Sequence, residues 1–400
     1  MKALILTNEY PPNVYGGAGV HVEYLSREMS KLIDVEVRCF GTQNSGTKNL
    51  KVKGYGFDPK LFENTDKQLK SVFTALYNCV MMNSTPVDAD VIHCHTWYTH
   101  FGGVTARKSY NIPLFITTHS LEPLRPWKRE QLGHGYEMSL WIENTALNMA
   151  DSIVAVSEGM KQDIIRLFDI DEKKITVIYN GIDTDEYKPT QSEDVLTEYG
   201  IDPDKPYVLF VGRITRQKGI IHLVNAISHI SDEAQIVLCA GQPDTPEIKA
   251  EMEAGVKKIQ EKRKNVIWIQ KMVPKAHIIP IYSHASVFCC PSIYEPFGII
   301  NLEAMACSVP VVASAVGGIV EIVQDGVTGS LVNLEQLKEC PFEPVEPNVF
   351  SKNLANAINK ILEDKTLRLK MGISGRTRAE QHFSWKTIAR EAVDLYSKFI

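Results

Sequence analysis

The sequence lacks the features that mark several common classes of protein. Its eight cysteines include no Cys-x-x-Cys pair, which argues against a zinc ribbon, and a disulfide framework is unusual in a chain of 400 residues. No apolar run approaches the roughly 20 residues that a membrane helix needs. The formal net charge of -5 provides no basic field for nucleic acid or for an anionic membrane. These absences predict a cytoplasmic protein with reduced thiols that acts on small molecules or neutral polymers, and they carry no indication of its oligomeric state.

The chain is long enough for two domains, because one hydrophobic core rarely organises 400 residues. Short β-rich apolar runs alternate with segments of helical periodicity, which is typical of parallel sheets covered by helices. The expected strands are 3–7, 35–40, 91–93, 114–118, 153–156, 175–178, 207–211, 236–240, 266–269, 287–290 and 311–313. The pattern predicts an α/β protein with two doubly wound, Rossmann-like domains that face each other across a cleft.

A polar, proline-bearing stretch from about 180 to 206 separates the two halves, as linkers between domains often do. We place the domains at 1–190 and 191–400, and we expect the last helix, about 384–400, to pack back on the N-terminal domain. Ligands of doubly wound sheets bind beyond the carboxyl ends of the strands. The site is therefore expected in the loops that follow the strands of both halves.

A glycine-rich turn with Gly16 and Gly17 follows the first strand and opens a helix. Backbone N–H groups and the helix dipole at such a turn favour a bound phosphate, although a tight packing turn explains the glycines equally well. The turn has neither the Gly-x-Gly-x-x-Gly order of a dinucleotide fold nor the Gly-Lys-Ser/Thr of a P-loop. A nicotinamide-dependent dehydrogenase and an NTPase are therefore disfavoured.

Two cations follow the first strand of the second half. Arg213 and Lys218 stand beside Gly212 and Gly219, where a ligand can approach the backbone, and together they suit a diphosphate. The alternative is a solvated basic loop, which we prefer for the neighbouring Arg216.

A pair of glutamates is the strongest single indication of a ligand-binding site in the sequence. Glu295 lies in a loop after a strand, and Glu303, eight positions on, lies within the helix that Gly298 opens. A loop carboxylate can orient sugar hydroxyls, and a carboxylate in the first turns of a helix can bind a ribose. A generic pair at this spacing is usually a helix-dipole residue and a surface charge. The apolar residues around Glu303 argue instead that the helix is buried, where a carboxylate is costly unless it binds something.

These motifs carry a resemblance to a known family. The segment from Gly212 to Gly219, followed by Glu295 and Glu303, resembles the retaining glycosyltransferases of the GT-B fold, family-four type. Segments 9–12, 15–20, 93–98, 117–128 and 155–157 resemble the actinobacterial-type subgroup of glycogen synthases and maltose-1-phosphate synthases. The run from Arg125 to Lys128 is the most specific piece.

The resemblance implies a role for each candidate residue. Arg213 and Lys218 would bind the departing diphosphate together with the turn at Gly16 and Gly17, whose Gly17 N–H would donate to it. The remaining donor-site assignments are Glu303 on the ribose, Glu295 on the glucose hydroxyls, His119 near the anomeric carbon, and Phe297, Gly298 and Ile299 in the turn that shapes the site. Tyr98 and Trp127 are candidates for stacking on acceptor sugar rings.

The expected reaction is transfer of glucose from ADP-glucose or UDP-glucose onto an α-glucan, with no cofactor and no metal. Glucose 1-phosphate is the second acceptor in rank, followed by another polysaccharide or small sugar. A sugar-nucleotide epimerase or hydrolase and a non-catalytic glucan-binding protein are the alternatives from other classes. His93 and His95 have the spacing of metal ligands, but we interpret them as residues that line the site.

Overall fold

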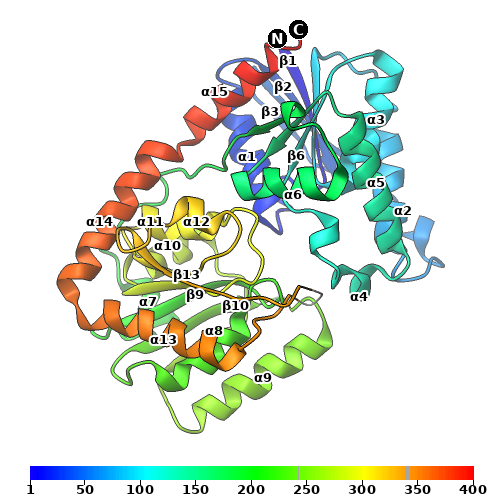
Figure 1. Cartoon of the computed structure of the whole chain (residues 1–400). Coiled ribbons are helices and arrows are strands. Elements are labelled where there is room, and N and C mark those ends of the chain that lie inside the picture. The colour runs from blue at the N-terminus through cyan, green and yellow to red at the C-terminus, as the bar shows by residue number, and fades with distance from the viewer. Residues whose placement is uncertain (242, 339–341) are drawn as a thin grey trace. The chain divides into compact units, whose positions relative to one another are not determined.

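The computed structural model describes residues 1–241, 243–338 and 342–400. It divides into two compact units (Figure 1). Unit 1 consists of Met1–Gly181 and Trp385–Ile400, and unit 2 consists of Ile182–Ser384. The last helix of the chain therefore belongs to unit 1.

The sheet of unit 1 has eight strands in the order β3-β4-β2-β1-β5-β6-β7-β8. All neighbouring strands are parallel except the β3 and β4 pair at one edge, which is antiparallel. The strands are β1 (Lys2–Thr7), β2 (Asp34–Phe40), β3 (Asn44–Gly46), β4 (Leu50–Tyr55), β5 (Val91–His95), β6 (Leu114–Thr118), β7 (Ser152–Ala155) and β8 (Ile175–Val177). The order reverses between β1 and β5, so the loops after these two strands diverge and leave a crevice at the carboxyl edge.

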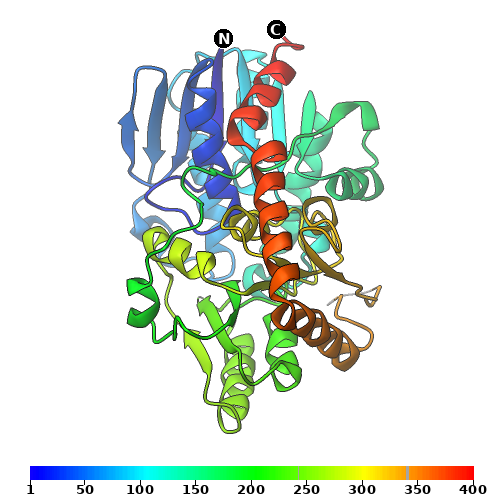
Figure 2. The same ribbon diagram turned by 90° about the vertical axis from the view of Figure 1, so that its left-hand side faces the viewer.

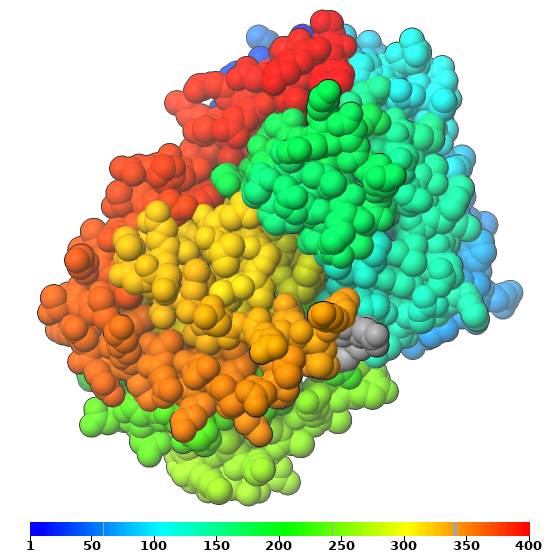
Figure 3. Space-filling model, in the orientation of Figure 1, coloured from blue at the N-terminus to red at the C-terminus, as the bar shows by residue number. Residues whose placement is uncertain are grey.

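Two groups of helices enclose this sheet. Figure 1 shows the strands between α1 and α15 on one side and α2, α3 and α5 on the other. The helices of unit 1 are α1 (Gly17–Met29), α2 (Lys70–Met82), α3 (Trp97–Tyr110), α4 (Lys128–Leu132), α5 (Gly135–Met149), α6 (Glu158–Phe168) and α15 (Trp385–Tyr396), with short 3-10 helices at η1 (Pro59–Phe62), η2 (Glu122–Leu124) and η3 (Glu172–Lys174). Helix α6 lies at the surface in Figure 3 and buries only the stripe Met160, Ile164 and Phe168.

Helix α15 completes the core of unit 1. Its residues Trp385, Ile388 and Tyr396 are buried in one apolar cluster with Val22 and Leu25 of α1. Figure 2 shows the red helix α15 beside the blue helix α1, to which it is adjacent in space but not in sequence. The burial of this apolar face supplies the free energy that holds the C-terminal helix in place.

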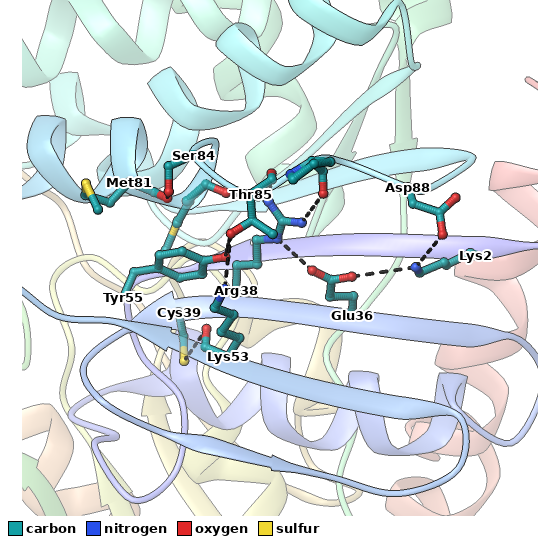
Figure 4. A network of polar contacts seen from close by, with 12 residues as sticks. Lys2, Glu36, Arg38, Cys39, Lys53, Tyr55, Met81, Ser84, Thr85 and Asp88 are labelled. Carbon is teal, nitrogen blue, oxygen red and sulfur yellow. Dashed lines mark hydrogen bonds and ion pairs between the residues drawn. The ribbon is translucent and has the colours of Figure 1, made fainter.

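A buried arginine closes the opposite side of the unit (Figure 4). Arg38 on β2 is 1% exposed, and its guanidinium donates to the backbone carbonyls of Met82, the last residue of α2, and of Thr85 and Pro86 in the following loop. Its Nε also donates to Glu36 at 2.7 Å. Three carbonyls that no helix or strand satisfies are thereby paired, which a buried loop requires.

The sheet of unit 2 has six strands in the order β11-β10-β9-β12-β13-β14, and all neighbours are parallel. The strands are β9 (Tyr207–Arg213), β10 (Gln235–Gly241), β11 (Val266–Ile269), β12 (Val287–Cys290), β13 (Val311–Ser314) and β14 (Gly329–Val332). The order reverses between β9 and β12. The loops after these two strands therefore flank the crevice where doubly wound sheets bind their ligands.

The helices of unit 2 cover its sheet in the same way. They are α7 (Asp194–Glu198), α8 (Ile220–Ala226), α9 (Pro246–Gln260), α10 (Lys275–Ser283), α11 (Ile299–Ala306), α12 (Ile319–Ile322), α13 (Pro347–Glu363) and α14 (Lys365–His382), with a 3-10 helix at η4 (Ile227–His229). Helices α8, α9 and α13 contribute to one large apolar core with β9 and β10. Arg263 in this unit donates to the carbonyls of Ile227, Ile230, Ser231 and Ala234.

The predicted α/β class and all eleven expected strands are confirmed. Three further strands, β3, β4 and β14, were not expected. The seven cysteines that lie within the described residues are buried and free, and Cys340 lies outside them. Among the described residues, no helix has both the length and the apolar character that crossing a membrane requires.

We expect Arg38→Met to lower the free energy of unfolding by about 3 kcal/mol, because it leaves the carbonyls of Met82, Thr85 and Pro86 without their buried donor. Urea unfolding followed by circular dichroism measures the change. Arg166→Met is the matched control, since Arg166 is 61% exposed and pairs with Asp163 on the same helix, and it should change stability by less than about 0.5 kcal/mol. Equal effects of the two substitutions would contradict this account of Arg38.

Candidate functional site

Two loops of unit 2 are joined by backbone contacts at the reversal of strand order. The loop after β9 and the loop after β12 are linked by a hydrogen bond from Ile293 N–H to the carbonyl of Gln217, at 3.0 Å. Gly219 has a φ of +58°, and a Cβ there would lie 2.1 Å from the carbonyl oxygen of Pro291. Only glycine therefore permits this close approach.

The joined loops bring Lys218 and Glu295 together. The Lys218 ammonium lies 2.6 Å from the Glu295 carboxylate, although the two residues are 77 positions apart in the sequence. Their side chains are 21% and 8% exposed. Ser292 Oγ donates to the same carboxylate oxygen at 3.3 Å. The ion pair is thus largely shielded from water and fixed from two sides.

Lys218 remains protonated in this setting. Burial alone lowers the pKa of its ammonium, but the attraction of the Glu295 carboxylate outweighs burial, and the net pKa is above the ordinary value. Lys218 can therefore present a full positive charge to an anionic ligand at neutral pH.

Arg213 is the last residue of β9 and lies at the same edge of the sheet. Its guanidinium donates to Asp244 at 2.9 Å, and its side chain is 42% exposed. The two cations thus each have a carboxylate partner. Asp244 and Glu295 therefore hold the two cations in place at this edge of the sheet. Binding of a diphosphate by Arg213 and Lys218 stays a prediction.

Glu303 lies within α11, which begins directly after Gly298 with its φ of +107°. The Tyr282 hydroxyl donates to the Glu303 carboxylate at 2.9 Å. Burial raises the pKa of Glu303, and hydrogen bonds from Tyr282 and Tyr187 oppose that rise. Phe297 before the helix is 2% exposed, and Ile299 at the helix start is half-buried.

The glycine-rich turn of unit 1 already contains an internal anion. Helix α1 begins at Gly17, and the Glu9 carboxylate accepts hydrogen bonds from the N–H groups of Tyr15 and Gly16, at 2.8 and 2.9 Å. A carboxylate thus occupies the positive end of the α1 dipole. The roles of Gly16 and Gly17 in binding a diphosphate stay predictions.

His119 follows β6 and lies against His95 at the end of β5, with 3.0 Å between His119 Nε2 and His95 Nδ1. Burial holds the pKa of His119 well below its usual range, so its imidazole is neutral at pH 7. Its predicted contact with the donor sugar stays a prediction.

The two aromatic candidates for the acceptor are packed within the protein. Tyr98 stacks on Trp97 with 4.1 Å between ring centroids and packs on the apolar cluster that includes Leu132 and Tyr136. Trp127 is 6% exposed. Stacking of either ring on a sugar stays a prediction.

Comparison with known proteins identifies the family. Residues 15–186 match the family model described as Glycosyltransferase Family 4, and residues 191–340 match the one described as Glycosyl transferases group 1. An alpha-maltose-1-phosphate synthase of Mycolicibacterium smegmatis is 43% identical over 402 residues, covering 100% of this chain and 99% of the relative. The chain belongs to the family 4 glycosyltransferases.

A second relative agrees with the family assignment, and a solved structure shares the fold. An alpha-maltose-1-phosphate synthase of Mycobacterium tuberculosis is 44% identical, again over 100% of this chain and 99% of the relative. The solved sucrose-phosphate synthase of Thermosynechococcus elongatus has a TM-score of 0.79 at 24% identity and covers 100% of this chain and 99% of that chain. The predicted GT-B fold class and the family-four resemblance are confirmed.

Several residues that position the glycosyltransferase site were not anticipated. Asp244, Ser292 and Tyr282 each contact a predicted site residue through a side chain. Gly317 and Gly318 follow β13, and Gly318 N–H donates to the carbonyl of Glu295 at 3.0 Å. A Gly-Gly pair shortly after an apolar strand is the sequence signal that could have pointed to this support.

We expect Gly219→Ala to destabilise the glycosyltransferase by about 3 kcal/mol, because it combines a strained positive φ with a clash against Pro291. Gly200→Ala separates the two causes. Gly200 has a φ of +73° but nothing within 4 Å of its Cβ position, so its cost should be about 1 kcal/mol. Chemical denaturation gives both values, and a Gly219→Ala variant no less stable than Gly200→Ala would contradict the close approach of the loops.

Proposed function

We propose that this glycosyltransferase transfers glucose, with retention of configuration, from a nucleoside diphosphate glucose to glucose 1-phosphate and so forms α-maltose 1-phosphate. The observation that carries this proposal is the full-length similarity to two alpha-maltose-1-phosphate synthases. The sequence expectation ranked an α-glucan first and glucose 1-phosphate second, and the comparisons favour the second acceptor.

The donor end of the reaction is assigned to unit 2. Lys218 and Arg213 take up the negative charge that develops on the departing diphosphate. When the phosphate oxygens replace the carboxylates around these cations, Glu295 is released to accept hydrogen bonds from glucose hydroxyls. Glu303, held by Tyr282, accepts from the ribose hydroxyls. Preorganised charges of this kind are commonly the largest single contribution to catalysis.

The proposed reaction breaks one bond at the glucose anomeric carbon and forms another there. The bond between the glucose anomeric carbon and the diphosphate oxygen breaks, and its electron pair leaves with the diphosphate. A hydroxyl oxygen of glucose 1-phosphate attacks the anomeric carbon from the face that the diphosphate leaves. Its proton passes to a phosphate oxygen of the leaving group, so no enzyme nucleophile is required. Retention follows because the new bond forms on the face where the old one broke.

The acceptor is tested by supplying the purified enzyme with ADP-glucose or UDP-glucose, each alone, with glycogen, or with glucose 1-phosphate. We expect nucleoside diphosphate release to depend on glucose 1-phosphate, with a labelled disaccharide phosphate as product. The donor that supports release identifies the base preference.

Other outcomes of this assay decide between the alternatives. Release that depends on glycogen alone would replace the proposal by a glycogen synthase. Equal release without any acceptor would indicate hydrolysis. The absence of release with every donor and acceptor would contradict the proposed reaction, and conversion of the donor into another nucleotide sugar would then indicate an epimerase.

We expect Lys218→Ala to lower kcat by about a hundredfold or more, the usual scale for the loss of one preorganised charge. Lys205→Ala is the matched control, because Lys205 is also a lysine of unit 2 in an ion pair but is 59% exposed, and it should stay within about twofold of the parent. Thermal melts verify that both variants are folded. A folded Lys218→Ala enzyme with near-normal turnover would overturn the assignment of Lys218.

A further inference from the structure

Three histidines from separate elements of unit 1 converge at the carboxyl edge of its sheet. His21 comes from α1, His95 ends β5, and His119 follows β6. One ring nitrogen from each lies within 4.8 Å of those of the other two. The register of the parallel strands explains two of them, because β5 and β6 are neighbours and His95 pairs with Thr117, two residues before His119.

Two of the three imidazoles are buried, the third is half-buried, and all three are neutral at pH 7. His21 is 2% exposed, His95 is fully buried and His119 is half-buried. Burial lowers the pKa of His21 to about 4, and it holds the pKa values of His95 and His119 well below their usual range. Neutral imidazole is the form that binds a metal ion.

The protonated nitrogen of His21 follows from its hydrogen bond. His21 Nδ1 lies 2.6 Å from Asn180 Oδ1, an oxygen that can only accept, so Nδ1 carries the hydrogen. The lone pair of His21 is therefore on Nε2, which is buried and has no hydrogen-bond partner. This is the arrangement that outer-shell groups impose on metal-binding histidines.

His95 and His119 face each other at a separation suited to a shared ion. His95 Nδ1 and His119 Nε2 are 3.0 Å apart and share a hydrogen bond, so a bound ion would take the place of the hydrogen between them. Two ligands of a tetrahedral zinc ion are about 3.3 Å apart, given Zn–N distances of about 2.0–2.1 Å. His95 Nε2 is also buried without a partner, so the protein itself leaves this group of imidazoles incompletely paired.

His93 is excluded from the group by its own partners. Its two ring nitrogens are bonded to the Tyr396 hydroxyl and the Thr117 hydroxyl. The spacing of His93 and His95 in the sequence therefore does not define the ligand set, which depends on His21 and His119 from distant segments.

We infer that His21, His95 and His119 form a binding site for a divalent transition-metal ion that prefers imidazole ligands, with Zn²⁺ as its representative. Three protein ligands leave a fourth position for water or another ligand. The sequence predicts no metal requirement, and the proposed transfer needs no metal. The ion instead binds the side chain of His119, the residue predicted to contact the donor sugar. Binding of the ion therefore keeps His119 from the donor and inhibits the enzyme.

The test uses the full chain, freed of metal with EDTA and titrated with Zn²⁺ by isothermal calorimetry. We expect one ion per chain at this site, and with Co²⁺ the intense visible absorption of a tetrahedral complex. His21→Ala should weaken binding by about a hundredfold or more, and Asn180→Ala should weaken it by about tenfold through the orientation of His21. Zn²⁺ at the concentration that fills the site should inhibit transfer reversibly.

His229→Ala is the matched control, because His229 is exposed in unit 2 and should leave binding unchanged. His119→Gln, at a half-buried position, provides a second test if His21→Ala does not fold, and it should also abolish the Co²⁺ absorption. The inference is overturned if the chain takes up no Zn²⁺, or if uptake is the same with His21 or His119 replaced, which would indicate surface binding only. These binding measurements need no substrate and do not depend on the proposed reaction.

Discussion

The parallel sheet is the constraint on which the functional geometry depends. Parallel strands require a crossover after each strand, so every strand-to-helix loop of a unit emerges at one edge. Where the strand order reverses, two such loops diverge and leave a crevice. In unit 2 this point lies between β9 and β12 and carries Lys218 and Glu295. In unit 1 it lies between β1 and β5, where Thr96 Oγ1 donates to Asn8 Oδ1 at 2.8 Å.

Ion pairs give this geometry its electrostatic character. Lys218 and Arg213 each have a carboxylate partner, and a carboxylate also occupies the N-terminus of α1. A cleft lined only by unpaired cations would be costly to fold, because buried charges need partners. The internal carboxylates pair with these cations in the protein itself. In the proposed reaction, a diphosphate displaces them, and substrate binding is an exchange of anions around fixed cations.

The sequence predicted most strands and the identities of the candidate residues, because both are local properties. Apolar runs marked the buried strands, whereas β4 reads Leu-Lys-Val-Lys-Gly-Tyr beside the edge strand β3, and β14 reads Gly-Ser-Leu-Val. Lys218 and Glu295 were recognised as candidate site residues because each is a charged residue in a loop that follows a strand. The partners could not be predicted, since Asp244 and Asn180 reach their sites only through the fold. His21 was not recognised as a candidate either, because in the sequence it is one residue within a helical pattern and its neighbours His95 and His119 come from distant segments.

Helix α15 belongs to unit 1 but follows unit 2 in the sequence, so the ribosome makes it last. Unit 2 is continuous in sequence and can close its core as soon as it leaves the ribosome. Unit 1 waits for Trp385 and Tyr396, which are synthesised after the whole of unit 2. Until then, the apolar face of α1 lacks its cover and is open to chaperones or to other nascent chains. The unit whose synthesis begins first is therefore the one whose core is completed last.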